Sequence, residues 1–390
     1  MSNEAFEIFL TDEQKAIRDT VREFAREEVA PVAMDIDHTA RFPMEHVTKM
    51  AELGLMGIPY PEEVGGAGFD ILSYVIAVEE LAKVCGSTSI TLAAHTSLGT
   101  NPIFAMGTPE QKKRWLPGLC SGKVIGAFGL TEPTAGSDAG ATKTTARLEG
   151  GKWIVNGRKV YCTNGTHAGT IVFTAVTEPG KGSNGISAFV VEKGTAGLKM
   201  GTLEKKLGLK ASDTREVLFE NMALPEENLL GGKRGEGFKE FMRTLTGGRI
   251  SIGAMALGLA EGAYERSVAY ARERKAFGKP IAEHQAIAFK LADMATQIAA
   301  AKHLVYYAAA LKDRGLPFAQ AASMAKLFAS EIAMKVTDDA IQVHGGYGYS
   351  REYEVERMYR DVKLCEIGEG TSEIQRLVIS REIVKSVAPA

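Results

Sequence analysis

The segment Gly150-Gly151-Lys152-Trp153-Ile154-Val155-Asn156-Gly157 decides the fold class. It places a short β-branched and aromatic run between two dipeptides that favour tight hairpin turns. Similar runs follow at residues 170–174, 186–191 and 216–219, and no helical pattern separates them. Strands at this spacing predict an antiparallel β-barrel or sandwich over residues 126–236.

Helical patterns lie on both sides of this segment. Thr11-Asp12-Glu13-Gln14 is a capping box that starts the first helix, and amphipathic runs then continue to about residue 125. Four further runs predict helices over residues 238–245, 250–274, 285–314 and 318–344. Many small residues in the later runs permit the close packing of a bundle. We predict an α+β protein with an N-terminal helical domain (1–125), a middle antiparallel β-barrel domain (126–236) and a C-terminal four-helix bundle (237–390).

Composition excludes several classes of function. The 390 residues carry a net charge of -2, so no global field favours nucleic acid or an anionic membrane. The four cysteines are widely spaced, which indicates reduced thiols and a cytoplasmic protein, and the seven histidines show no metal-binding spacing. We find no signal or transit pattern and no apolar run near the ~18 residues of a membrane span.

The stretch Ile367-Gly368-Glu369-Gly370-Thr371 is the candidate catalytic segment. A carboxylate between two glycines lies where the backbone turns freely and where no neighbouring side chain crowds it. This suits a general base that reaches a bound substrate, and the hydroxyl of Thr371 could meet a cofactor phosphate. By itself a Gly-Glu-Gly is most often an exposed turn, so the interpretation depends on four other stretches.

Two of these stretches belong to the predicted β domain. The loop 128–140 offers small residues together with Thr131 and Ser137, and its backbone N–H groups could meet a flavin edge or phosphates. The alternative is a domain-linking loop. In Tyr161-Cys162-Thr163, which we place at the close of a hairpin, Tyr161 could stack on a ring while Thr163 forms a hydrogen bond. The alternative is a half-buried strand end.

The other two stretches belong to the C-terminal helices. Arg274 could clamp a pyrophosphate, Phe277 could cover an adenine, and Gln285 starts the next helix. The alternative is an ordinary basic helix end. Segment 342–349 has three glycines in four residues, which suggests close approach by something flat or phosphorylated, whereas His344 is expected to be a packed histidine.

These stretches together resemble the acyl-CoA dehydrogenase family over the whole chain. Leu130 to Asp138 and Gln342 to Asp361 look like the two signature patterns of that family, and Arg274-x-x-Phe277-Gly278 and Glu369-Gly370-Thr371 follow at the expected intervals. The motifs of serine hydrolases, P-loop proteins and dinucleotide-binding folds do not occur.

The resemblance implies a flavoenzyme with FAD at a subunit interface of a homotetramer, and electron-transferring flavoprotein as the acceptor. It implies that the isoalloxazine and adjoining pyrophosphate are surrounded by Phe128, Leu130, Thr131, Ser137, Tyr161 and Thr163. It places on the ADP half the neighbouring subunit's Arg274, Phe277, Gln285, Gln342 and Gly346, and near the ribose and phosphates Thr371 and Glu373. Along the acyl-CoA it implies Ser137, Thr246, Arg249 and Gly370.

The resemblance also implies a mechanism. Glu369 would remove the α-proton of the acyl-CoA while a hydride leaves the β-carbon for flavin N5. Some relatives carry the base on an earlier helix, at a position that is Gly248 here, which favours Glu369. Gly368 stands where straight-chain members commonly have tyrosine, so we predict a widened cavity that tolerates a short branched acyl group. An oxidase that reduces oxygen and a catalytically silent scaffold are the alternatives.

The segment expected to line the acyl tail, Val84 through Gln111, has no Lys or Arg. A dicarboxylyl substrate would favour a cation there, so the sequence disfavours a glutaryl-type activity.

Overall fold

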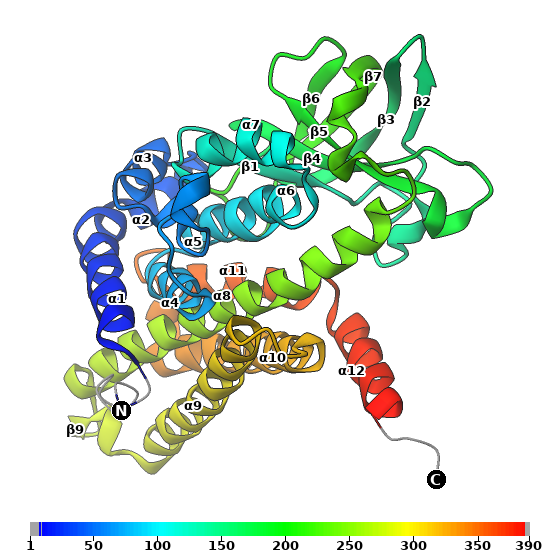
Figure 1. The fold of residues 1–390 in the computed structure, drawn as a ribbon. Coiled ribbons are helices and arrows are strands. Elements are labelled where there is room, and N and C mark those ends of the chain that lie inside the picture. Colours follow the sequence, from blue (N-terminus) through cyan, green and yellow to red (C-terminus); the bar gives the residue numbers. More distant parts are fainter. Residues whose placement is uncertain (1–7, 9, 387–390) are drawn as a thin grey trace.

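A computed structural model describes Ile8 and residues 10–386. It shows a group of helices, a curled β-sheet and a second group of helices along the chain (Figure 1). This confirms the predicted α+β class and domain order. The N-terminal helices are α1 (Asp12–Phe24), α2 (Ala30–Thr39), α3 (Met44–Glu52), α4 (Ile71–Ala82), α5 (Gly86–Ala93), α6 (Asn101–Met106) and α7 (Pro109–Cys120).

The start of α1 has the predicted capping box. The Thr11 hydroxyl accepts from the Gln14 N–H at 3.2 Å, and the Gln14 side chain accepts from the Thr11 N–H at 3.0 Å. The helical path continues past Pro31, through a π-helical turn over Ala25–Val29 and then α2. Proline is tolerated there because it lies in the first turn of α2, where an N–H has no partner within the helix.

The middle domain is a seven-stranded sheet in the order β1-β4-β2-β3-β7-β6, with β5 paired to β4. Its strands are β1 (Ile125–Gly129), β2 (Thr145–Glu149), β3 (Lys152–Thr163), β4 (Ala168–Val176), β5 (Ile186–Glu192), β6 (Leu198–Leu203) and β7 (Thr214–Pro225). The pairing is mixed rather than purely antiparallel, since β1 and β2 each run parallel to β4. The strands at 125–129, 145–149 and 198–203 lacked a clear β-branched pattern and were not predicted.

The two predicted hairpin turns have different outcomes. Gly150-Gly151 joins β2 to β3, and both residues have positive φ (54° and 74°), so this prediction is confirmed. Asn156-Gly157 as a turn is wrong, because β3 continues through it with a bulge. A β-carbon on Gly157 would clash with Thr144, and the Asn156 side chain accepts from the Asn221 N–H at 2.8 Å, so the dipeptide serves packing between strands.

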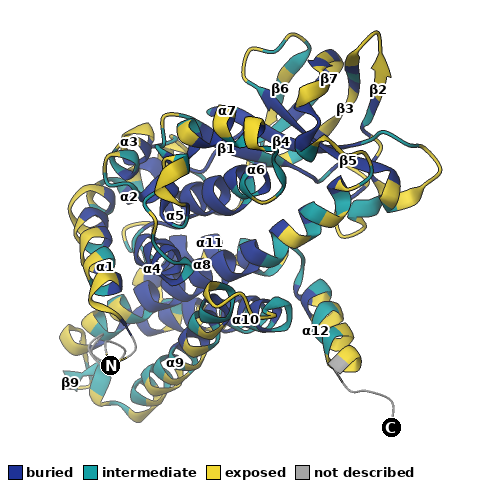
Figure 2. Ribbon diagram, viewed as in Figure 1, coloured by how far each residue is buried: buried dark blue, intermediate teal, exposed yellow. Residues whose placement is uncertain are grey.

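The C-terminal helices are α8 (Gly237–Glu273), α9 (Gln285–Asp313), α10 (Ala319–His344), α11 (Val355–Ile367) and α12 (Ser372–Ser386), with a small hairpin of β8 (Lys275–Ala276) and β9 (Lys279–Pro280) after α8. We predicted an interruption between residues 245 and 250, but α8 is continuous there. The middle of α8 is buried against α4 and α10, whereas α12 projects from the bundle with much of its surface exposed (Figure 2). Among the described residues, no helix has the length and apolarity required to cross a membrane.

Candidate active site

Glu369 lies in the short connection between α11 and α12, with an unusual backbone conformation. Its φ is 54° and that of Gly370 is 96°, so a non-glycine residue adopts the left-handed region. Gln375 Nε2 donates to the carbonyl oxygens of Glu369 (3.2 Å) and Gly370 (2.8 Å), and Lys326 Nζ donates to that of Gly370 at 2.5 Å. These bonds hold a strained turn in place, as is typical of functional positions.

The carboxylate of Glu369 is directed at α8, where Gly248 leaves the space that it occupies. A β-carbon on Gly248 would overlap Oε2 of Glu369. Oε2 is closed off from solvent and accepts no hydrogen bond from the part of the chain that the structure describes. Burial therefore raises the pKa of Glu369 to about 7, although the nearby Lys326 and Arg249 cations oppose the shift. The space that Glu369 requires also explains why a glycine stands at position 248 inside the continuous helix α8, where the sequence predicted an interruption.

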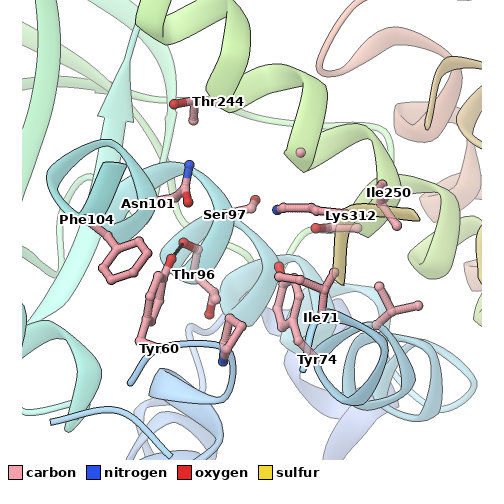
Figure 3. A pocket seen from close by; sticks show the side chains of 14 residues that line it. Tyr60, Ile71, Tyr74, Thr96, Ser97, Asn101, Phe104, Thr244, Ile250 and Lys312 are labelled. Atoms are coloured by element: carbon pink, nitrogen blue, oxygen red, sulfur yellow. Dashed lines mark hydrogen bonds between the residues drawn. The ribbon is translucent and has the colours of Figure 1, made fainter. Parts of the chain in front are cut away.

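A cavity of about 110 Å³ adjoins this site. Gly247 lines it, and the next residue of α8 is the one that makes room for Glu369. Figure 3 shows Tyr60, Thr96, Ser97, Phe104 and Lys312 around it. The complete lining is Pro59, Tyr60, Ile71, Tyr74, Val75, Thr96, Ser97, Asn101, Phe104, Thr244, Gly247, Ile250, Ser251 and Lys312.

Several hydroxyl groups of the cavity wall are already engaged with the backbone. Tyr60 donates to the Thr96 carbonyl at 2.5 Å, and Tyr74 and Ser97 donate to the Ala93 carbonyl at 3.2 and 2.7 Å. These oxygens therefore contribute fixed walls, and the hydrocarbon parts of the lining side chains leave a cavity suited to a small organic group.

The predicted flavin-edge residues lie on β1, on β3 and in the loop that follows β1. The Phe128 ring stacks on Phe241 with centroids 4.4 Å apart, Leu130 is buried, and the Thr131 carbonyl accepts from the Val160 N–H at 2.8 Å. Ser137 is exposed, and Thr163 ends β3.

Tyr161 departs from the strand geometry that we predicted. It has φ of 57° within a bulge of β3, and its side chain is 65% exposed. The stretch does not close a hairpin either, because β3 pairs with β2 and β7 and the following strand, β4, pairs elsewhere. The strand-like residues ahead of Asn164-Gly165 led us to predict a hairpin between β3 and β4. The two strands are not neighbours in the sheet, and adjacent residues give no sign of this.

The predicted ADP-half residues gather at the other end of α8. Arg274, Gly345, Gly346 and Tyr347 line an open pocket of about 670 Å³. The Phe277 side chain beside it is 97% exposed, Gln285 is the first residue of α9, and Gln342 lies in the last turn of α10. Figure 1 shows that this end, marked by β9, lies at the opposite side of the chain from the β domain. Within one chain, the predicted flavin-edge residues and the predicted ADP-half residues therefore do not form a single site.

This pocket has the chemistry that a dinucleotide requires. The Arg274 guanidinium lies over the Tyr347 ring at 5.7 Å and forms no ion pair with any described residue. β-Carbons on Gly345 and Gly346 would meet nothing within 4 Å, so the backbone is open to close approach. His344 packs as predicted, against Tyr270 with ring centroids 4.4 Å apart and against the Ala340 carbonyl at 2.8 Å.

The remaining candidates have mostly local partners. Thr371 caps α12 by accepting from the Ile374 N–H at 3.4 Å, and Glu373 is exposed. The Thr246 hydroxyl donates to the Met242 carbonyl at 3.0 Å. Buried Arg249 donates to the Ser323 hydroxyl at 3.1 Å.

Gly368 ends α11 and does not line the cavity. A β-carbon on it would contact only Leu364. Its predicted effect on cavity width is therefore not visible in the lining.

Sequence reasoning missed Lys326, Gln375 and Lys312. Lys326 interrupts an alanine-rich stretch of α10 and is fully buried, and burial lowers its pKa to about 8 against the opposing effect of Cys365 and Glu369. A lysine on the inner face of a predicted helix is the signal that could have found it. Lys312 gave no such signal, because the residues around it come from distant segments. Gln375 bonds to carbonyl oxygens only five and six residues away, but a glutamine near the start of a helix is an ordinary residue there and does not point to this role.

Three family models cover this chain, described as the N-terminal (residues 11–123), middle (127–222) and C-terminal (235–384) domains of acyl-CoA dehydrogenase. The chain belongs to the acyl-CoA dehydrogenase family. It is therefore an FAD-dependent oxidoreductase that acts on the CH–CH bond of acyl-CoA thioesters, as the sequence predicted.

Individual relatives agree with this membership. The chain is 54% identical over 376 residues to the short-chain specific acyl-CoA dehydrogenase of Clostridium acetobutylicum, covering 96% of this chain and 99% of the relative. Butyryl-CoA dehydrogenase from Megasphaera elsdenii matches with a TM-score of 0.95 at 44% identity, over 96% of this chain and 99% of that one. An acyl-CoA dehydrogenase of Bacillus anthracis complexed with FAD matches with a TM-score of 0.91 at 36% identity, over 97% and 68%.

Proposed function

We propose that this acyl-CoA dehydrogenase oxidises short acyl-CoA thioesters to the 2-enoyl-CoA, with Glu369 as the base that removes the α-proton. The observation that carries the proposal is the unbonded Glu369 Oε2 over Gly248, beside a cavity of about 110 Å³. FAD, when bound, supplies the acceptor for the hydride that leaves the β-carbon.

The environment of Glu369 suits proton abstraction. With a pKa of about 7, a substantial fraction of the carboxyl is ionised at neutral pH, and the ionised form is more basic than an ordinary exposed carboxylate. An oxygen without hydrogen bonds loses no partner when it takes the proton. Lys326 and Gln375 hold the backbone of the turn, so the carboxylate keeps its direction, and the Glu369 N–H can donate to the thioester carbonyl as charge develops there.

Cavity size supports a short acyl group. An apolar cavity of about 150 Å³ accommodates benzene, so a cavity of about 110 Å³ fits a small acyl remainder rather than a long chain. The names of the C. acetobutylicum and M. elsdenii relatives point the same way. Branching near the reacting carbons, inferred from Gly368, is the finer part of this proposal.

The proposal includes assembly. The flavin-edge residues and the ADP-half residues lie at opposite ends of one chain, so a second copy has to supply one of the two groups. This supports FAD binding between subunits in a homotetramer, with electron-transferring flavoprotein as acceptor by family resemblance. Four free cysteines, all buried, fit a cytoplasmic enzyme.

An anaerobic bleaching screen of the FAD-loaded enzyme tests the function. We expect butyryl- and isovaleryl-CoA to bleach the flavin absorbance and form 2-enoyl-CoA faster than hexanoyl- or octanoyl-CoA. Absence of bleaching with every thioester would support the silent scaffold and end the proposal. A preference for octanoyl-CoA would refute the short-chain assignment. Hydrogen peroxide release without an added carrier would identify an oxidase.

A further inference from the structure

Lys312 brings a positive charge to the acyl cavity from a distant part of the chain. It lies in the last turn of α9, and Figure 3 shows its amino group directed across the cavity toward Ser97. The segment 84–111 contains no Lys or Arg, as the sequence shows. The expectation against carboxylated acyl groups considered that segment alone and did not include the lysine that α9 supplies.

The Lys312 amine forms no ion pair within 4.0 Å and no hydrogen bond with any described residue. The carboxylate of the adjacent Asp313 accepts from the N–H groups of Ile71 and Leu72 at 2.7 and 3.2 Å, which occupies it at the start of α4. Nζ lies 5.9 Å from the centroid of the Phe318 ring. Burial lowers the pKa of Lys312, with Asp313 opposing the shift. Lys312 is half-buried and its amine opens on the cavity, so a group that fills the cavity and displaces water has to supply the acceptor for the amine.

The place of this amine relative to the base is fixed by two neighbouring glycines of α8. A β-carbon on Gly247 would come within 2.9 Å of Lys312 Nζ, and one on Gly248 would overlap Glu369 Oε2. The Glu369 carboxylate and the Lys312 amine therefore each lie against a glycine, and the two glycines are neighbours in α8. A short acyl group with its α-carbon at Glu369 extends into a cavity that has a hydrogen-bond donor in its wall.

We propose that Lys312 is the specificity-determining residue of the acyl cavity, and that the cavity takes a short acyl group whose distal end carries an oxygen acceptor. The inference rests on the proposed dehydrogenation with Glu369 as base. A carboxylate or a ketone oxygen would satisfy the N–H groups of Lys312, whereas an alkyl end would leave them without an acceptor.

Three thioesters with equal numbers of heavy atoms in the acyl group provide the test. Glutaryl-CoA ends in a carboxylate, 5-oxohexanoyl-CoA in a neutral methyl ketone, and 5-methylhexanoyl-CoA in an isopropyl group. For the FAD-loaded wild-type enzyme we expect kcat/KM for flavin reduction to be about tenfold or more higher with an oxygen-bearing end than with the isopropyl end. A preference for glutaryl over 5-oxohexanoyl identifies the charged acceptor, and the reverse identifies the neutral one.

Lys312→Met should abolish this preference, and Lys312→Gln, which keeps a donor, should retain part of it for the ketone. Lys199→Met, at an exposed lysine of β6, is the matched control and should leave the preference unchanged. Equal kcat/KM for the three thioesters in the wild-type enzyme, or the same preference in Lys312→Met, would overturn the inference. If Lys312→Met does not fold, the wild-type comparison decides alone. Oxidation of butyryl-CoA by the wild-type enzyme shows separately whether the proposed function holds.

Discussion

Two carboxylates, that of buried Glu132 and that of half-buried Glu369, have opposite surroundings. Glu132, in the loop after β1, accepts from the Lys143 and Thr144 N–H groups at 2.7 and 3.1 Å, from Lys159 Nζ at 2.7 Å and from the Thr142 hydroxyl. Burial alone would raise its pKa, but the Lys159 charge and these hydrogen bonds lower it to about 2. Glu369 has an oxygen without any such bond and a pKa of about 7. Burial raises the pKa at both sites, and the partners that oppose it decide which carboxylate can accept a proton.

The two sites also make opposite contributions to stability. An unfolded glutamate titrates near ~4.3. The stabilisation from Glu132 is complete above that pH and is lost as the pH falls toward about 2. The raised pKa of Glu369 has the other sign, because the folded state binds more protons, so its contribution becomes unfavourable as the pH rises from ~4.3 through about 7. The active site is thus destabilising at neutral pH, whereas the structural site is stabilising.

The largest expected effect is on Glu369 itself. Glu369→Gln removes the proton acceptor with little change in shape, so kcat for butyryl-CoA should fall by at least ~10²-fold. Flavin absorbance should stay close to the wild-type value, and the melting temperature at neutral pH should not fall, because no hydrogen bond to Oε2 is lost and the unfavourable ionised carboxylate is removed. Stopped-flow flavin reduction measures the rate, and a near-normal rate would show that another group is the base.

Removing the ion-pair partner of Glu132 should lower the free energy of unfolding. Lys159 is fully buried, and Lys159→Met leaves the Glu132 charge without its ion-pair partner, which costs about 3–5 kcal/mol of unfolding free energy. Urea unfolding of the FAD-loaded protein measures the change. The matched control is Lys199→Met, because the exposed Lys199–Glu220 pair contributes only about 0–1 kcal/mol. Equal losses for the two variants would contradict the distinction between the sites.

Gly248→Ala tests the space that the base occupies. The added methyl group overlaps Oε2, so the carboxylate has to move, and a displacement of this kind reduces kcat/KM by roughly ten- to 10²-fold. Gly253→Ala on the same helix is the control, since its β-carbon would come no closer than 3.3 Å to Val305 and alanine favours a helix. A rate unchanged in Gly248→Ala would mean that Glu369 does not act from this position.

Local patterns in the sequence were sufficient for the helices, the capping box at Thr11 and the Gly150-Gly151 turn, since each depends on a few adjacent residues. They failed at Asn156-Gly157, where the glycine is required by Thr144, the residue just before β2. The identity of Glu369 as the candidate base came from its motif and the family resemblance. The contact of its carboxylate with Gly248 spans more than a hundred residues, and the turn with its left-handed φ is held by Lys326 on another helix, so no local pattern contains them.

The smallest expected effect concerns Lys326, the cation that lowers the pKa of Glu369 most. Glu369 should titrate with a midpoint near pH 7 in the kcat/KM profile, and activity should fall below it because the protonated carboxyl cannot accept the α-proton. Lys326→Met removes a positive charge that lowers the pKa of Glu369, so the midpoint should move to higher pH, by on the order of one unit. Lys326→Arg should restore it. A purely structural role of Lys326 in holding the Gly370 carbonyl would reduce the rate at all pH values and leave the midpoint where it is. The direction of the shift therefore shows whether the active site keeps its base poised by charge as well as by burial.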